Sequence, residues 1–200
     1  MRIFKTWNGE LDDKQLNQVT AFLESGELMI WPTDTLYAMA CDALNPKAVE
    51  RLCRLKGLNP NKSNLSIVCS DISQASVYAH WDNCFFSMLK RNTPGKFTFI
   101  FKTASTLPKV FKGRKKVGVR IPELELNRQI AEKLGRPLLT TSINFDTEDY
   151  AVNPELIIEK YSSDIDFMID AGNGGIEPST VVDCTGNEAE IIRQGAGELT

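Results

Sequence analysis

Histidine is nearly absent from this 200-residue chain, which contains only His80. It stands in Tyr78-Ala79-His80-Trp81. A metal site built from several histidines is therefore excluded, and a Ser-His-Asp triad has a single candidate base. We expect any chemistry to depend on lysine, arginine, hydroxyl and carboxylate side chains, with loosely held Mg²⁺ as the remaining metal.

Paired cysteines and long apolar runs are also missing. The cysteines form no CxxC pair, and their apolar surroundings predict buried free thiols. There are five: Cys41, Cys53, Cys69, Cys84 and Cys184. The start of the chain lacks the apolar run of a signal peptide, and no segment approaches the ~20 residues of a membrane span. We expect a soluble protein of the reducing cytoplasm that does not contact a membrane.

The overall composition is that of an average globular protein. An apolar fraction of 42% and a charged fraction of 24% argue against disorder, collagen and coiled coils. A chain of this length can bury roughly 70% of its unfolded surface in one core, which leaves room for a pocket. The net charge of -3 argues against a protein that coats nucleic acid with its whole surface.

One basic stretch departs from this average. Five cations fall within eight residues: Lys109, Lys112, Arg114, Lys115 and Lys116. A solvated loop and a patch that faces a phosphate-rich partner, such as tRNA or double-stranded RNA, are both open interpretations.

Helix signals and strand patterns alternate along the chain. Asp12 or Asp13 begins a helix that ends at Gly26, and Asn45-Pro46 begins one that ends near Lys56-Gly57. Buried strands are predicted at 28–31, 117–121 and 138–142. The whole pattern, roughly eight strands and five or six helices over residues 1–200, predicts one α/β (α+β) domain. Its sheet should be twisted, mixed parallel and antiparallel, and flanked by helices.

Familiar nucleotide motifs are absent. There is no GxxxxGK[ST], and Gly172-Asn173-Gly174-Gly175 is followed by neither a helical pattern nor a lysine, so a turn between strands is expected there. A phosphate site would have to be assembled from separate segments.

Polar residues at the ends of predicted strands and helices are the candidates. Two hydroxyls and a carboxylate in Thr33-Asp34-Thr35 can hold an ammonium group, a hydroxyl or a water on Mg²⁺, or they can satisfy their own turn. Lys56 lies at a helix C-terminus, where the dipole alone favours a cation. Ser142 and Asn144 follow an apolar strand, at a possible carboxyl edge of the sheet.

Two arginines need anionic partners or solvent. Arg120 lies between Val119 and Ile121 in an apolar strand, so it requires an internal partner such as Asp183 or a ligand carboxylate or phosphate. Arg193 ends the last strand and, with Ser179, resembles a clamp, although a surface arginine is the alternative.

Taken in order, several motifs resemble the YrdC-like family over about residues 12–197. They are Trp31-Pro32-Thr33-Asp34-Thr35-Leu36-Tyr37-Ala38, Leu55-Lys56-Gly57, Thr93-Pro94-Gly95-Lys96-Phe97-Thr98, Gly118-Val119-Arg120-Ile121-Pro122, Thr141-Ser142-Ile143-Asn144, Pro178-Ser179-Thr180-Val181-Val182-Asp183 and Arg193-Gln194-Gly195. The resemblance implies that family's fold and the activity of its threonylcarbamoyl-AMP synthases. These are nucleotidyltransferases that convert L-threonine, bicarbonate and ATP, with Mg²⁺, into threonylcarbamoyl-adenylate and pyrophosphate for tRNA modification.

The resemblance also implies which residues bind each substrate. L-threonine contacts would come from Thr33, Thr35, Arg120 and Ser179. ATP contacts would come from Lys56, Thr98, Ser142, Asn144 and Arg193. Catalysis would rest on positioning and charge stabilisation without a protein nucleophile, and Asp34 is the candidate metal contact.

Departures from the synthase pattern resemble the YciO branch of the family. Leu58 replaces a phosphate-binding arginine, Val68 stands where a ligand-facing histidine is frequent, and the additional C-terminal domain of longer members is lacking. Weakened synthase activity is therefore expected. The alternatives are an RNA-binding translation or ribosome-maturation factor without synthase activity, and carbamoyl transfer to another acceptor.

Overall fold

The structure of the protein, a computed structural model, describes residues 1–59, 65–107, 115–145 and 147–200. Its elements in chain order are β1 (Arg2–Lys5), α1 (Asp13–Glu24), β2 (Met29–Trp31), β3 (Ala38–Asp42), α2 (Pro46–Leu55), β4 (Ser66–Val68), α3 (Ile72–Tyr78), β5 (Ala79–His80), α4 (Asn83–Asn92), β6 (Phe97–Thr103), β7 (Lys116–Arg120), α5 (Glu125–Leu134), β8 (Leu138–Ser142), α6 (Asp149–Val152), α7 (Pro154–Tyr161), β9 (Phe167–Asp170), β10 (Thr180–Asp183) and β11 (Glu190–Arg193).

The described residues thus form eleven strands and seven helices, more than the sequence predicts. Among the unpredicted elements, β5 has two residues and α6 has four, too few to show a periodicity. The caps at the predicted helix starts are present: Asp12 and Gln15 form a capping box before α1, and the Asn45 side chain accepts from two backbone N–H groups of α2.

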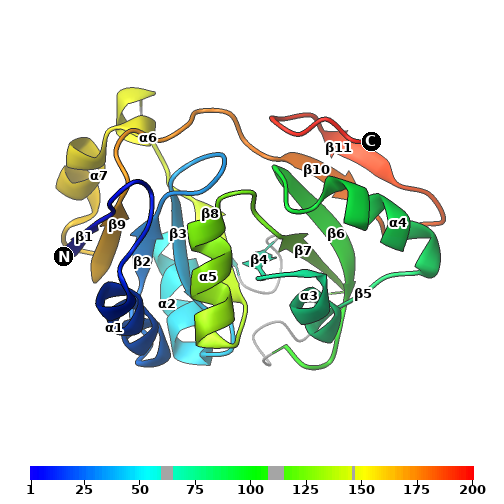
Figure 1. The fold of residues 1–200 in the computed structure, drawn as a ribbon, viewed down its shortest axis with the longest axis horizontal. Helices are drawn as coiled ribbons and strands as arrows, with labels where there is room; N and C mark the ends of the chain where they lie inside the picture. Colours follow the sequence, from blue (N-terminus) through cyan, green and yellow to red (C-terminus); the bar gives the residue numbers. More distant parts are fainter. Residues whose placement is uncertain (60–64, 108–114, 146) are drawn as a thin grey trace.

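All strands join one mixed sheet, in the order β1-β9-β2-β3-β8-β4-β7-β6-β10-β11, with β5 beside β6 (Figure 1). In the middle, β8 is antiparallel to β4, whereas β4 is parallel to β7. The strands β7 and β8 therefore run in opposite directions, with only the three-residue β4 between them. The predicted mixed sheet is confirmed.

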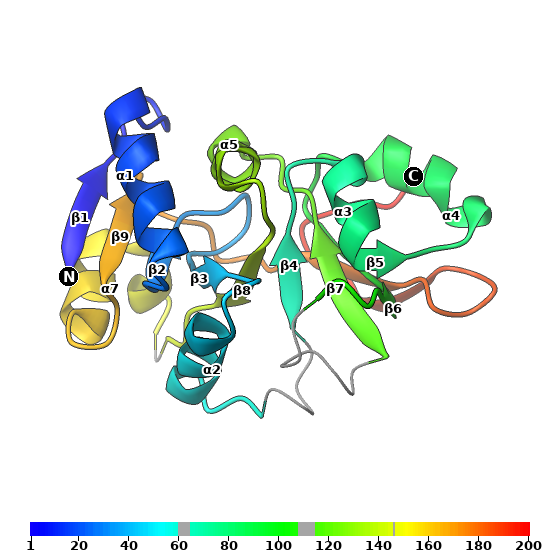
Figure 2. The same cartoon turned by 90° about the horizontal axis from the view of Figure 1, so that it is seen from below.

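Helices cover both faces of the sheet (Figure 2). On one face α1 and α5 lie side by side, and their Leu23 and Ile130 belong to one buried apolar cluster. On the opposite face α2 and α7 bury Leu52 and Ile157 in the larger cluster. The amphipathic stripes that predict these helices are the surfaces that pack on the sheet.

The prediction of buried thiols holds for four of the five cysteines. Cys84 is exposed, because its side of the first turn of α4 faces solvent. Within the described ranges, no helix is both long and apolar enough to cross a lipid bilayer.

Candidate functional site

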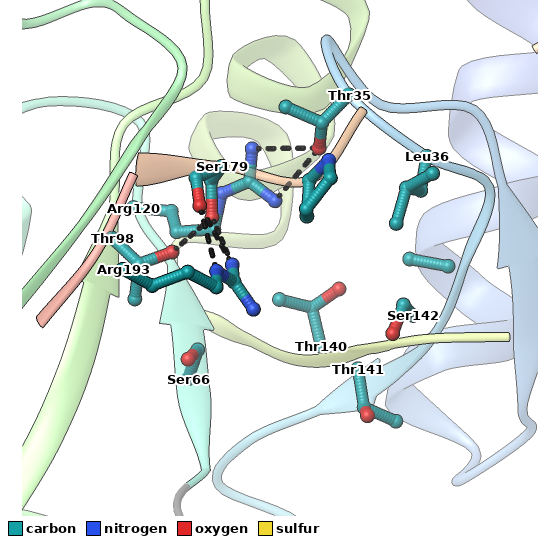
Figure 3. A pocket seen from close by; sticks show the side chains of 12 residues that line it. Thr35, Leu36, Ser66, Thr98, Arg120, Thr140, Thr141, Ser142, Ser179 and Arg193 are labelled. Atoms are coloured by element: carbon teal, nitrogen blue, oxygen red, sulfur yellow. Dashed lines mark hydrogen bonds between the residues drawn. The ribbon is translucent and has the colours of Figure 1, made fainter. Parts of the chain in front are cut away.

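A polar pocket of about 170 Å³ lies on the middle of the sheet (Figure 3). Seven lining side chains carry hydroxyls, and two are arginines: Thr35, Ser66, Thr98, Thr140, Thr141, Ser142 and Ser179, with Arg120 and Arg193. Leu36, Ala38 and Pro178 complete the lining. None of these described residues is a carboxylate. Hydrogen-bond donors and positive charge around a small cavity suit an anionic, oxygen-rich ligand.

The pocket floor is the face of the sheet itself. Ser66 on β4 is in register with Thr140 on β8 and with Gly118 on β7. A Cβ at Gly118 would come within 2.4 Å of Ser66 Oγ, so glycine leaves space for that hydroxyl. Because β7 and β8 are antiparallel, their carboxyl ends lie at opposite edges. The site therefore spreads across the sheet and does not lie at one carboxyl edge.

Arg120, the last residue of β7, is paired with Asp34. Its Nη2 donates to Asp34 Oδ1 at 2.5 Å, and Nη1 and Nη2 both lie 3.3 Å from Thr35 Oγ1. The side chains of Arg120 and Asp34 are only 10% and 2% exposed. Burial lowers the pKa of Arg120, Asp34 opposes that shift, and the nearby Arg193 adds to it. A desolvated guanidinium requires such a partner.

The internal partner suggested for Arg120 from the sequence, Asp183, is wrong. Asp183 accepts from Lys116 Nζ at 2.7 Å and from the Thr185 hydroxyl at 2.6 Å. Asp34 takes that place from a loop 86 residues away in sequence, a contact that local pattern does not reveal.

Asp34 uses both carboxylate oxygens, since Oδ2 accepts from the backbone N–H of Glu123 at 2.9 Å. Among the residues that the structure describes, no three His, Cys, Asp or Glu side chains gather where they could hold a metal ion. Both oxygens of Asp34 are engaged within the protein, and its contact with a metal stays a prediction. Magnesium that accompanies ATP stays a prediction.

The Thr33 side chain holds the position of Thr35 through hydrogen bonds. Its hydroxyl donates to the Leu36 carbonyl at 2.7 Å, accepts from the N–H groups of Thr35 and Leu36, and lies 3.0 Å from Thr35 Oγ1. The turn interpretation therefore applies to Thr33, whereas Thr35 lines the pocket and its contact with a ligand stays a prediction.

Arg193 and Ser179 lie together, as the sequence predicts. Arg193 Nη2 donates to the Ser179 carbonyl at 2.7 Å and lies 3.3 Å from Ser179 Oγ, which is 2.8 Å from Thr98 Oγ1. A Cβ at Gly195 would come within 2.1 Å of the Pro178 carbonyl. Glycine at this position lets the chain after β11 approach closely enough for Arg193 to enter the pocket.

Lys56 reaches the pocket rim at Ser142. Its Nζ donates to the Ser142 carbonyl at 2.6 Å and to Asn144 Oδ1 at 2.5 Å. Burial, and secondarily the charge of Lys160, lower the pKa of Lys56. The three residues expected at a phosphate site, Lys56, Ser142 and Asn144, are therefore brought together.

The two residues after Lys56 end helix α2. Gly57 has a φ of +63° and its N–H donates to the Arg54 carbonyl, while the N–H of Leu58 donates to the Cys53 carbonyl at 2.8 Å. This is a Schellman motif, in which the residue after the glycine commonly makes an apolar contact. Leu58 accordingly packs against the main core. Leu58, which stands where the family resemblance implies an arginine, is thus part of the C-terminal end of α2.

Tyr161 is a further supporting residue that the sequence analysis misses. Its hydroxyl donates to the Asn144 carbonyl at 2.5 Å and accepts from the Asn144 N–H at 3.0 Å. A tyrosine in the last turn of an amphipathic helix gives no local indication of this role, although a buried tyrosine hydroxyl usually needs a partner.

Sequence reasoning also misses Ser66, which begins β4, and Thr140 and Thr141, which precede Ser142 in β8. The buried Thr140 Oγ1 has no hydrogen-bond partner among the described residues. Val68 is fully buried in the apolar cluster beneath α1 and α5 and does not line the pocket.

The basic stretch is described only in part. Lys109, Lys112 and Arg114 lie outside the described residues. Lys115 is exposed, whereas Lys116 pairs with Asp183 and lines a cavity of about 60 Å³ that adjoins the pocket at Ser66 and Thr98. RNA binding by this stretch stays a prediction.

The fold and the pocket define a mixed α/β protein with a hydroxyl-lined pocket that contains two arginines. The chain belongs to the Sua5/YciO/YrdC family, whose profile, described as "Telomere recombination", matches residues 21–195.

Individual relatives agree with this assignment. YciO of Escherichia coli is 33% identical over 92% of this chain and 90% of its own length, and its crystal structure superposes with a TM-score of 0.90 at 32% identity over 99% of this chain and 98% of that one. The threonylcarbamoyl-AMP synthase of Bacillus subtilis is 28% identical over 92% of this chain and 54% of its own length. P. abyssi Sua5 complexed with L-threonine has a TM-score of 0.84 at 26% identity, over 97% of this chain and 57% of that one.

Proposed function

We propose that this chain is an L-threonylcarbamoyladenylate synthase, a nucleotidyltransferase that joins L-threonine, bicarbonate and ATP into threonylcarbamoyl-AMP and pyrophosphate. The name of the Bacillus subtilis relative and the L-threonine bound to P. abyssi Sua5 support this proposal. The activated product would serve as the donor for modification of an adenosine in tRNA.

The observation that carries the proposal is the separation of cations around one pocket. Arg120 and Arg193 lie at one end, among the hydroxyls of Thr35, Thr98 and Ser179. Lys56 lies at the rim beside Ser142 and Asn144. Two separate sites for negative charge suit two anionic groups held together, the carboxylate of an amino acid and a polyphosphate.

Roles follow from these positions. Arg120, Thr35 and Ser179 bind the threonine carboxylate and hydroxyl. Lys56, Ser142 and Asn144 hold the phosphates, and Arg193 and Thr98, at the arginine end, would contact the part of ATP nearest the amino acid. The protein aligns an oxygen of the carbamate formed on the threonine nitrogen with the α-phosphorus of ATP. As the new O–P bond forms, the bond to pyrophosphate breaks, and the cations offset the charge of the departing pyrophosphate, so no protein nucleophile is needed.

We expect weakened activity because Leu58 adds no charge at the phosphate end. Loss of one charge-assisted contact to a phosphate typically weakens binding by about 1.5–3 kcal/mol, or about 10- to 200-fold. Replacing Leu58 by arginine would restore a cation near Lys56, at the expense of its apolar contact with the core.

The test is to measure threonylcarbamoyl-AMP and pyrophosphate formed from ATP, bicarbonate and L-threonine. The comparison includes the wild type, Lys56→Ala and Leu58→Arg. The proposal predicts product that is lost in Lys56→Ala and increased in Leu58→Arg. Absence of product in every variant, despite measurable ATP binding, would refute the synthase assignment and favour RNA binding or another carbamoyl acceptor.

A further inference from the structure

The charges around the pocket do not cancel. Arg120 from β7 and Arg193 from β11 line it, and Asp34, from the loop before β3, is the carboxylate bonded to Arg120. The contributions of β4, β6 and β8 are uncharged hydroxyls, and the lining residues within the described ranges include no carboxylate, histidine or cysteine.

Two lysines lie near the pocket but outside its lining. Lys56 adds a cation at the rim, and Lys116, beyond Ser66 and Thr98, is paired with Asp183. The two arginines and Asp34 leave one excess positive charge.

A free amino acid does not balance this excess in its ordinary form. At neutral pH it carries one carboxylate and one ammonium, so its net charge is zero. Placing another positive charge beside the two arginines is unfavourable, because Arg120 is largely shielded from water and solvent screens its charge little. The same amino acid with a neutral amine carries one net negative charge and matches the pocket.

We propose, on the basis of the proposed function, that the pocket binds L-threonine with its amine neutral and releases one proton to solvent on binding. Arg193 is the residue that creates the imbalance, since Arg120 already has Asp34. The effect of Arg193 on the pKa of Arg120 supports their closeness. The pocket would therefore do more than hold the carboxylate: it would prepare the nitrogen for reaction.

The neutral amine is the reactive form for carbamoylation. Its lone pair forms the N–C bond to bicarbonate, one C–O bond breaks, and the departing hydroxide leaves with an amine proton as water: R–NH₂ + HCO₃⁻ → R–NH–CO₂⁻ + H₂O. The new carbamate adds negative charge, which Arg193 is placed to meet.

Calorimetric titration of L-threonine into the wild type, without bicarbonate and in two buffers of different ionisation enthalpy, counts the protons released. We expect close to one proton per threonine at pH 7, and an affinity that falls about tenfold for each pH unit below neutrality, the slope of a one-proton linkage. The analogue 2,3-dihydroxybutanoate, which lacks the amine, should bind without this slope.

Variants locate the source of the proton. Arg193→Gln should bind threonine through Arg120 but release far less of a proton, whereas Arg193→Lys should retain the release. Arg2→Gln is the matched control, since Arg2 pairs with Glu27 on the opposite edge of the sheet. Lys56→Gln tests whether the proton comes from Lys56, another group near the pocket that can lose one, and this variant should also retain the release.

The outcomes separate this inference from the proposed function. Threonine binding without proton release, or release that disappears in Lys56→Gln, would overturn the inference and leave the synthase proposal standing. Absence of threonine binding at every pH would overturn both. If circular dichroism shows that Arg193→Gln does not fold, the proton count of the wild type and the binding of the amine-free analogue still decide whether threonine loses a proton on binding.

Discussion

The two ends of the pocket are built in different ways. At the arginine end, Arg120 is buried, paired with Asp34 and hydrogen-bonded to Thr35. At the lysine end, Lys56 donates to neutral acceptors, the Ser142 carbonyl and the Asn144 amide oxygen.

This difference shows where the chain departs from the synthase pattern. The arginine end keeps every residue that the family resemblance assigns to threonine, and each is held by contacts inside the protein. The lysine end keeps Lys56, Ser142 and Asn144, but Leu58 belongs to a helix end and packs on the core. We infer that the amino-acid site is complete and that the phosphate site is weakened.

The largest expected effect is on stability, at the arginine end. Asp34→Ala leaves Arg120 buried without its partner, which should lower the free energy of unfolding by about 3–5 kcal/mol. Asp183→Ala is the matched control, because its partner Lys116 is 51% exposed and such pairs contribute about 0–1 kcal/mol. Urea denaturation measures both variants, and equal losses would contradict the difference in burial.

A smaller effect is expected at the lysine end. Lys56→Ala removes the cation held beside Ser142 and Asn144, so ATP affinity should fall by about 10- to 200-fold, equivalent to about 1.5–3 kcal/mol. Fluorescence titration with a labelled ATP analogue measures the change. Unchanged affinity would remove Lys56 from the phosphate site.

Alkaline pH should weaken the lysine end before the arginine end. Burial and Lys160 lower the pKa of Lys56 from its ordinary value. Its charge is present below that lowered pKa and lost as pH rises through it, so ATP affinity should decline at a lower pH than a normal lysine would allow. Lys56→Arg should retain affinity over the same range, because arginine keeps its proton. Parallel decline in both proteins would assign the titration to another group.

The smallest effect is expected from the support behind Asn144. Tyr161→Phe removes a hydroxyl that bonds both the N–H and the carbonyl of Asn144, contacts that typically contribute about 0.5–1.5 kcal/mol each. ATP affinity should decline by a few fold while threonine affinity is unchanged. A larger loss of affinity for threonine than for ATP would contradict the prediction that Tyr161 supports the lysine end of the pocket.

Local patterns predicted the elements better than the contacts between them. Asn45-Pro46 and Lys56-Gly57 delimit α2 because caps and glycine turns act over a few residues. Arg120 in an apolar strand correctly predicted a need for a partner, but choosing Asp34 over Asp183 required the order of the strands. That order depends on packing over the whole sheet.

The site residues that were predicted lie in the quoted motifs, and most of those that were missed lie outside the motifs. Lys56, Ser142, Asn144, Arg193 and Ser179 were found, and the structure brings them to one pocket or its rim. Ser66 and Thr140 were missed, because a hydroxyl in a buried strand has the same local pattern whether it faces a pocket or the core.

The most direct test of the two-ended pocket is a crossed binding measurement by calorimetry. L-threonine and ATP are each titrated into Arg120→Gln and Lys56→Ala, with the wild type as reference. The account predicts that Arg120→Gln loses threonine affinity and keeps ATP affinity, and that Lys56→Ala shows the reverse. Loss of both ligands in each folded variant, or of neither, would contradict a division of the pocket into an amino-acid end and a phosphate end.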